Sequence, residues 1–95
     1  MRCQFDHRLR HFMVFERFQF DPQNRDHYWD IEFSRPNSND TEGVFSLMYD
    51  DTARPPRWFL DLRRPTGEQR TVADFQKRPG LNQVIKLVQD QFKMS

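Results

Sequence analysis

The residues best suited to metal chemistry are Cys3, His7 and His11, which recur at every fourth position. On a helix this spacing would place a thiolate and two imidazoles near one face, and His27 would complete a tetrahedral zinc site. The first ten residues carry no helical apolar stripe, however, and no paired cysteines accompany them. We therefore interpret these side chains as surface groups and predict no metal centre.

Carboxylates and hydroxyls are the next candidates for catalysis. A metal nuclease would hold a divalent ion with acids and assist it with a lysine, but no lysine closely follows any of the five candidate acids. Among the serines, Ser34, Ser38 and Ser46 lie outside any glycine-flanked elbow. Three glycines leave no loop that could cradle a phosphate. We therefore predict a protein that is not an enzyme and takes no cofactor. The five acids are Asp30, Glu32, Asp50, Asp51 and Asp61.

The stretch 54–71 shows how the chain positions its side chains. After Pro55 and Pro56 the residues alternate in a period of two, which is typical of a half-buried strand. The turn Pro65-Thr66-Gly67 then predicts a hairpin, whose second strand would be residues 69–72. Because successive side chains on a strand point to opposite sides, two sets of residues should occupy the two faces. One set is Trp58, Leu60 and Leu62, and the other is Phe59, Asp61 and Arg63.

Three earlier segments alternate in the same way. Residues 11–20 predict a strand, bulged near Phe15 and Glu16, and residues 21–24 predict a turn. Residues 27–35 and 44–49 predict two further strands, separated by the wholly polar loop 36–43. The bulky residues that share one face would be Phe12, Val14, Phe18 and Phe20; Trp29, Ile31 and Phe33; and Phe45, Leu47 and Tyr49.

The period changes towards the C-terminus. Asp74 could cap a short helical turn through Phe75 and Lys77, which Pro79 and Gly80 would end. From Leu81 the spacing becomes helical, which predicts an amphipathic helix of about three turns. Its apolar stripe would be Leu81, Val84, Ile85, Val88 and Phe92.

This order of elements predicts the α+β class: an antiparallel meander of four to five strands, with one C-terminal amphipathic helix packed on one face. We expect residues 1–95 to form a single domain, because about 100 to 200 residues per domain is usual, and residues 1–10 to be a flexible arm. One cysteine and no recognisable leader indicate a cytoplasmic protein, and no apolar run approaches the length of a membrane span.

Charge is segregated along the chain, although the net charge is only +1. Residues 26–51 carry seven acids and one arginine, whereas residues 54–78 carry seven basic residues and three acids. Neighbouring strands could neutralise each other across the sheet, or the surface could be dipolar and face two partners. Twelve of the fifteen basic residues are arginine, whose planar fork favours recognition of carboxylate or phosphate.

One helix cannot cover both faces of such a sheet. The face opposite the expected helix would carry Met13, Phe15, Tyr28, Phe59 and Arg63. Large apolar residues on this face should be covered by another surface. A homodimer contact, the N-terminal arm or another protein could cover this face.

Two functions fit this description. The first is a non-enzymatic protein-binding module, an adaptor or inhibitor that docks on a larger protein partner; compact chains of this type are frequent among phage and mobile-element inhibitors of host machinery. The second is a sheet platform for single-stranded nucleic acid, with aromatic rings on the bases and arginines on the phosphates. The order of strands followed by a helix is similar in outline to coactivator-type single-strand binders, but the many acids favour the first. The predicted binding residues are Arg54, Arg57, Trp58, Phe59, Arg63, Arg64, Arg70 and Tyr28.

Overall fold

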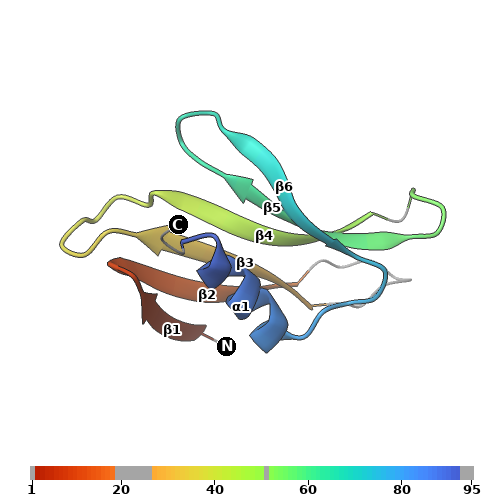
Figure 1. The fold of residues 1–95 in the computed structure, drawn as a ribbon, viewed down its shortest axis with the longest axis horizontal. Coiled ribbons are helices and arrows are strands. Elements are labelled where there is room, and N and C mark those ends of the chain that lie inside the picture. The colour runs from red at the N-terminus through yellow and green to blue at the C-terminus, as the bar shows by residue number, and fades with distance from the viewer. Residues whose placement is uncertain (1, 19–26, 51, 93–95) are drawn as a thin grey trace.

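A computed structural model describes residues 2–18, 27–50 and 52–92. Six antiparallel strands form one sheet in the order β1-β2-β3-β4-β5-β6, and one helix follows them (Figure 1). The small antiparallel sheet with a C-terminal helix confirms the predicted class, but the prediction of four to five strands was wrong. The elements are β1 (Arg2–His7), β2 (Arg10–Phe18), β3 (His27–Ser34), β4 (Gly43–Asp50), β5 (Arg57–Arg63), β6 (Gln69–Phe75) and α1 (Leu81–Asp90).

The additional strand is β1, which occupies most of the segment predicted to be a flexible arm. It pairs along its whole length with β2, from Arg2 opposite Phe15 to His7 opposite Arg10. Cys3 and Phe5 pack against the core, and the Phe5 ring stacks on Phe12 with 4.6 Å between centroids. The sequence concealed this hairpin because its two-residue turn has neither glycine nor asparagine, the residues typical of such turns.

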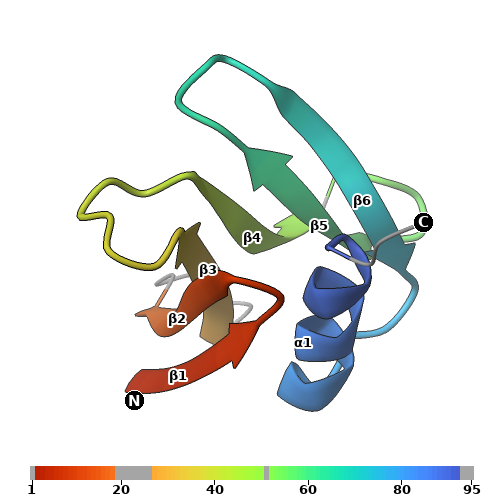
Figure 2. The ribbon, with the colours of Figure 1, turned by 60° about the vertical axis from the view of Figure 1, so that its left-hand side comes forward.

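The core lies between the sheet and α1. Every second residue of the central strands faces the helix, and the fully buried members of this layer include Ile31, Phe33, Phe45 and Leu60. Trp58 and Leu62 are also buried, as the alternation of residues 57–63 predicts. The sheet curves around the helix (Figure 2), so that α1 contacts strands far apart in the sequence.

The helix is anchored by valines and by an aromatic cluster at its C-terminal end. Val84 and Val88 are completely buried, and the Phe92 ring meets Phe12, Phe33 and Phe45 edge-on with centroids 5.0–6.1 Å apart. The predicted stripe was incomplete, because Leu87 also packs against the core.

Two local predictions were wrong. Asp74, Phe75 and the residues before them continue β6 instead of starting a helical turn. The bulge lies between β5 and β6, where the register shifts at Leu60 and Asp61, whereas β2 pairs with β3 without a shift. The predicted turn at residues 21–24 lies outside the described residues. Within the described ranges no helix has the length and apolar character of a membrane span.

Candidate binding surface on the second sheet face

The face of the sheet opposite α1, called here the second face, carries the side chains that alternate with the core. No other described element lies over it (Figures 1 and 2). Met13, Phe15, Val44, Met48 and Phe59 point to this side and are half-buried. The second face therefore combines a partly exposed apolar surface with the polar groups described next.

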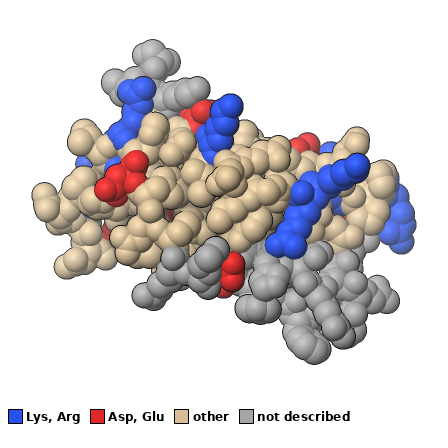
Figure 3. All heavy atoms as spheres, turned by 90° about the horizontal axis from the view of Figure 1, so that it is seen from below, with Lys and Arg blue, Asp and Glu red and all other residues tan. Residues whose placement is uncertain are grey.

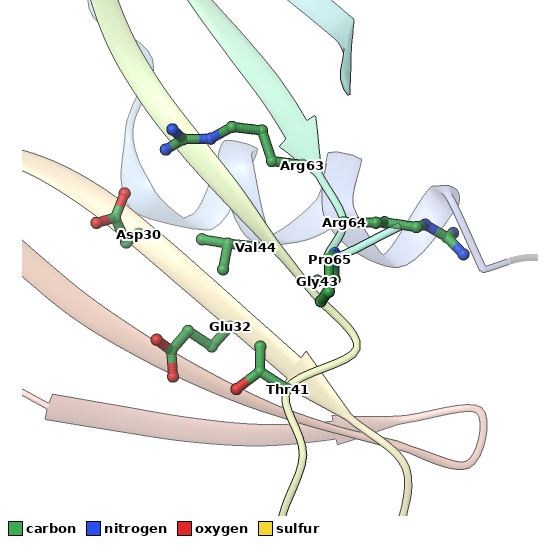
Figure 4. Close-up of a pocket in the computed structure, with 8 residues that line it drawn as sticks. All are labelled: Asp30, Glu32, Thr41, Gly43, Val44, Arg63, Arg64 and Pro65. Carbon is green, nitrogen blue, oxygen red and sulfur yellow. The ribbon is translucent and has the colours of Figure 1, made fainter. Parts of the chain in front are cut away.

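The larger hollow on this face lies at the end of β3, β4 and β5 and measures about 490 Å³. Asp30 and Glu32 of β3 line one side of it, and Val44 lies between them and β5 (Figure 4). The Arg63 side chain extends across β4 towards the β3 side, whereas Arg64 points away from the two carboxylates (Figure 4). The remaining lining residues are Thr41, Gly43 and Pro65.

A second hollow of about 240 Å³ adjoins the first one, because Glu32 and Thr41 line both. Met13 and Phe15 form part of its wall. Glu32 lines both hollows and makes no hydrogen bond or ion pair with the described part of the chain. The two hollows form one shallow depression with an apolar wall and an acidic centre.

A polar row crosses the middle of the second face. Ser46 of β4 lies opposite Asp61 of β5, which lies opposite Thr71 of β6. Arg63 donates a hydrogen bond from Nη2 to Ser46 Oγ over 3.0 Å, and the Thr71 hydroxyl donates one to Asp61 Oδ1 over 2.7 Å. Ser46 is completely buried and Asp61 is 7% exposed. This row holds the Arg63 side chain against the sheet.

The structure brings only some of the predicted binding residues to the second face. Arg57, Phe59 and Arg63 alternate there along β5, and Arg64 lines the larger hollow. Trp58 is 5% exposed in the core, so its ring is not accessible to a partner.

The other predicted residues lie elsewhere or outside the described side chains. Arg70 pairs with Leu62 of the core layer and so lies on the helix side of the sheet. Arg54 lies in the exposed segment before β5. Tyr28 belongs to β3, but its side chain is outside the described residues.

Several of these arginines have acidic partners within their own hairpin. Arg57 lies 3.1 Å from Asp74, while Arg64 and Arg70 lie 3.3 and 3.4 Å from the two oxygens of Glu68. Arg57 also lies opposite Asp50 of β4, where its charge contributes to lowering the pKa of that carboxyl. Acids of the hairpin and of segment 26–51 therefore both act on these arginines. Basic and acidic side chains are also interspersed on the side seen from below (Figure 3).

The residues considered for metal chemistry do not converge. Cys3 and His7 lie on the helix side of β1, whereas His11 lies on the opposite side, where its Nδ1 contacts Asp6. No group of three potential ligands occurs within the described ranges. Asp50 lies at the end of β4, and hydrogen bonds from the Thr52 hydroxyl and backbone N–H hold the pKa of its carboxyl below the ordinary value.

The predicted residue set omitted several groups of the depression. Glu32 was considered only as a metal ligand, and Thr41 and Val44 were not considered as binding residues. Strand parity could have identified Glu32, since it alternates with Ile31 and Phe33. Thr41 belongs to the loop before β4, and period-two alternation carries no information about loop positions.

Comparison of the chain with models of known protein families, with curated proteins and with solved structures found no match. The geometry of the surface is therefore the basis for assigning a function.

Proposed function

We propose that this protein is a non-enzymatic binding module, an adaptor or inhibitor, that docks on a larger protein through its second face. The observation that carries the proposal is the depression at the ends of β3, β4 and β5, where half-buried apolar side chains lie beside Glu32, whose carboxylate has no ion pair among the described residues. Protein interfaces combine an apolar centre with a polar rim in this way. A basic side chain of the partner would fit beside Glu32, with its aliphatic part on Val44 or Met13.

Binding to single-stranded nucleic acid is supported less well. Such a site needs exposed rings for the bases and free arginines for the phosphates. Trp58 is buried, and Arg57, Arg64 and Arg70 each lie beside a carboxylate.

The test is retention of a partner from a lysate on the immobilised protein. The variant Met13→Gln/Glu32→Gln keeps side-chain volumes but removes the apolar contact and the charge, so it should lose the partner. Lys86→Gln, an exposed change on α1, should retain it. Equal retention by the two variants would place the binding surface elsewhere.

Arg63→Gln and Arg64→Gln test the arginine contribution separately. Truncating a residue at a binding hot spot weakens the binding free energy by about 2 kcal/mol or more. Truncating a residue that only neutralises a neighbouring charge should instead lower the stability of the fold and leave the affinity unchanged. We expect Arg63→Gln to weaken binding, because its guanidinium lies over the second face. A salt titration with an arbitrary oligonucleotide tests the nucleic-acid alternative, since phosphate contacts weaken steeply with salt.

A further inference from the structure

The turn between β1 and β2 presents the exposed, apolar side chain of Leu9. Among the large apolar side chains that the structure describes, only Leu9 is exposed, with 80% of its surface accessible. The turn and the β3–β4 loop lie at the same end of the molecule, on the left in Figure 1. The hollows beside Leu9 share no lining residue with the depression on the second face.

The turn residues adopt a conformation that their side chains disfavour. Arg8 and Leu9 have φ values of 50° and 58°, which belong to the left-handed region and to the type I′ turn. Asparagine and glycine are the residues that suit these two positions. Backbone conformations of this kind cluster at functional sites, where the side chains matter more than local stability.

Leu9 also separates two hollows. One measures about 410 Å³ and is lined by Arg8, Leu9, Arg10 and Phe92, and the other measures about 370 Å³ and is lined by Leu9, Arg10, Arg35 and Pro36. An apolar side chain can therefore contact Leu9 from either side, beside Phe92 or beside Pro36.

Positive charge surrounds these hollows in excess. Arg10 Nε lies 2.7 Å from Glu42 Oε2, and Arg35 Nε lies 3.9 Å from the same oxygen. Arg8 makes no ion pair with the described part of the chain. Two guanidinium groups thus share the Glu42 carboxylate and Arg8 adds a third positive charge, so the partner that complements them is acidic.

We propose that the β1–β2 turn is a second binding site, which takes an acidic protein segment whose apolar side chains pack against Leu9. The carboxylates of the segment pair with Arg8 and Arg35, and its apolar side chains occupy the hollows on either side of Leu9. This site does not depend on the second face, so either site can exist without the other.

The test uses two variants of the full chain and a control variant that removes one arginine charge elsewhere. Arg8→Asn/Leu9→Gly places the favoured residues in the turn, and should raise the melting temperature by at least about 4 °C while removing the site. Arg8→Gln/Arg35→Gln keeps Leu9 and removes two charges. Arg70→Gln on β6 is the control.

The probe is a pool of fluorescent heptapeptides in which Asp or Glu alternates with Leu, Ile or Phe. We expect this pool to bind at least about tenfold more tightly than a pool in which Lys replaces the acidic residues or a pool in which Ser replaces the apolar residues. Both variants should bind the acidic pool about tenfold more weakly than the native protein does. Arg70→Gln and Met13→Gln/Glu32→Gln should bind the pool normally.

Equal binding of the three pools, or normal binding by Arg8→Asn/Leu9→Gly, would overturn the proposal. A single-stranded oligonucleotide and anionic phospholipid vesicles serve as alternative probes. The proposal would also be overturned if either probe bound through the β1–β2 turn and the acidic peptide pool did not bind.

Discussion

Gly43 occupies a position on β4 where a side chain would collide with its neighbours. A Cβ atom there would lie 2.6 Å from Phe33 Cζ and 3.1 Å from the Arg63 carbonyl oxygen. Because Phe33 is completely buried, its ring cannot move aside without disturbing the core. We expect Gly43→Ala to lower the free energy of unfolding by about 1 to 3 kcal/mol, as overpacking does. Gly80→Ala, where nothing lies within 4 Å, should change it little in the same urea titration.

Asp50 allows the local electrostatics to be tested directly. Its pKa is lowered chiefly by the hydrogen bond from the Thr52 hydroxyl, so Thr52→Val should raise the carboxyl pKa towards the ordinary value of aspartate. A lowered pKa in the folded state stabilises the fold above the unfolded-state pKa, and this contribution disappears as the pH falls through the folded-state pKa. NMR titration of the carboxyl carbon measures the shift. An unchanged pKa in Thr52→Val would show that the backbone N–H groups of Thr52 and Ala53, together with Arg57, account for the lowering.

At the scale of elements, α1 should be necessary for cooperative folding. Val88 is completely buried against the sheet, so Val88→Asp would place an unpaired charge in the core, which is very costly. We expect this variant to lose its cooperative unfolding transition in circular dichroism. Lys86→Asp, an exposed change on the same helix, should keep it. A chain ending at Pro79 that unfolds with the native midpoint would contradict this role.

Alternation predicted β3, β4 and β5 well, because each has one apolar face buried under α1. It missed β1, whose exposed positions, Gln4 and Asp6, made the segment look polar throughout. The chain beyond Val72 was also misassigned, since a local capping pattern at Asp74 cannot reveal that a neighbouring strand continues. Asp61 was assigned to the open face, yet the hydrogen bond from Thr71 and the neighbouring Ser46 enclose it. Such cross-strand contacts depend on the register, which shifts between β5 and β6 at Leu60 and Asp61, and the alternation within one strand does not reveal a bulge of this kind.

At the scale of the whole molecule, the second face leads us to expect self-association in the absence of a partner. Pairing of identical faces around a two-fold axis is the commonest way in which a protein covers such a surface. Sedimentation over a concentration series should show a monomer–dimer equilibrium. Met13→Gln/Met48→Gln, which keeps volume but lowers apolar character, should shift it towards monomer. A native protein that remains monomeric throughout would contradict the dimer and leave the second face free for the partner.

The meander also bears on how the chain folds. Each strand pairs only with its neighbours in sequence, so the hairpins close short loops and can form early, as expected for local contacts. The contacts of Phe92 with Phe12 and Phe33 join the two ends of the chain and can form only once the strands are aligned. Helix docking should thus be a late step. Truncating Phe92 should therefore accelerate unfolding more than it slows folding, whereas truncating Leu60 should slow folding.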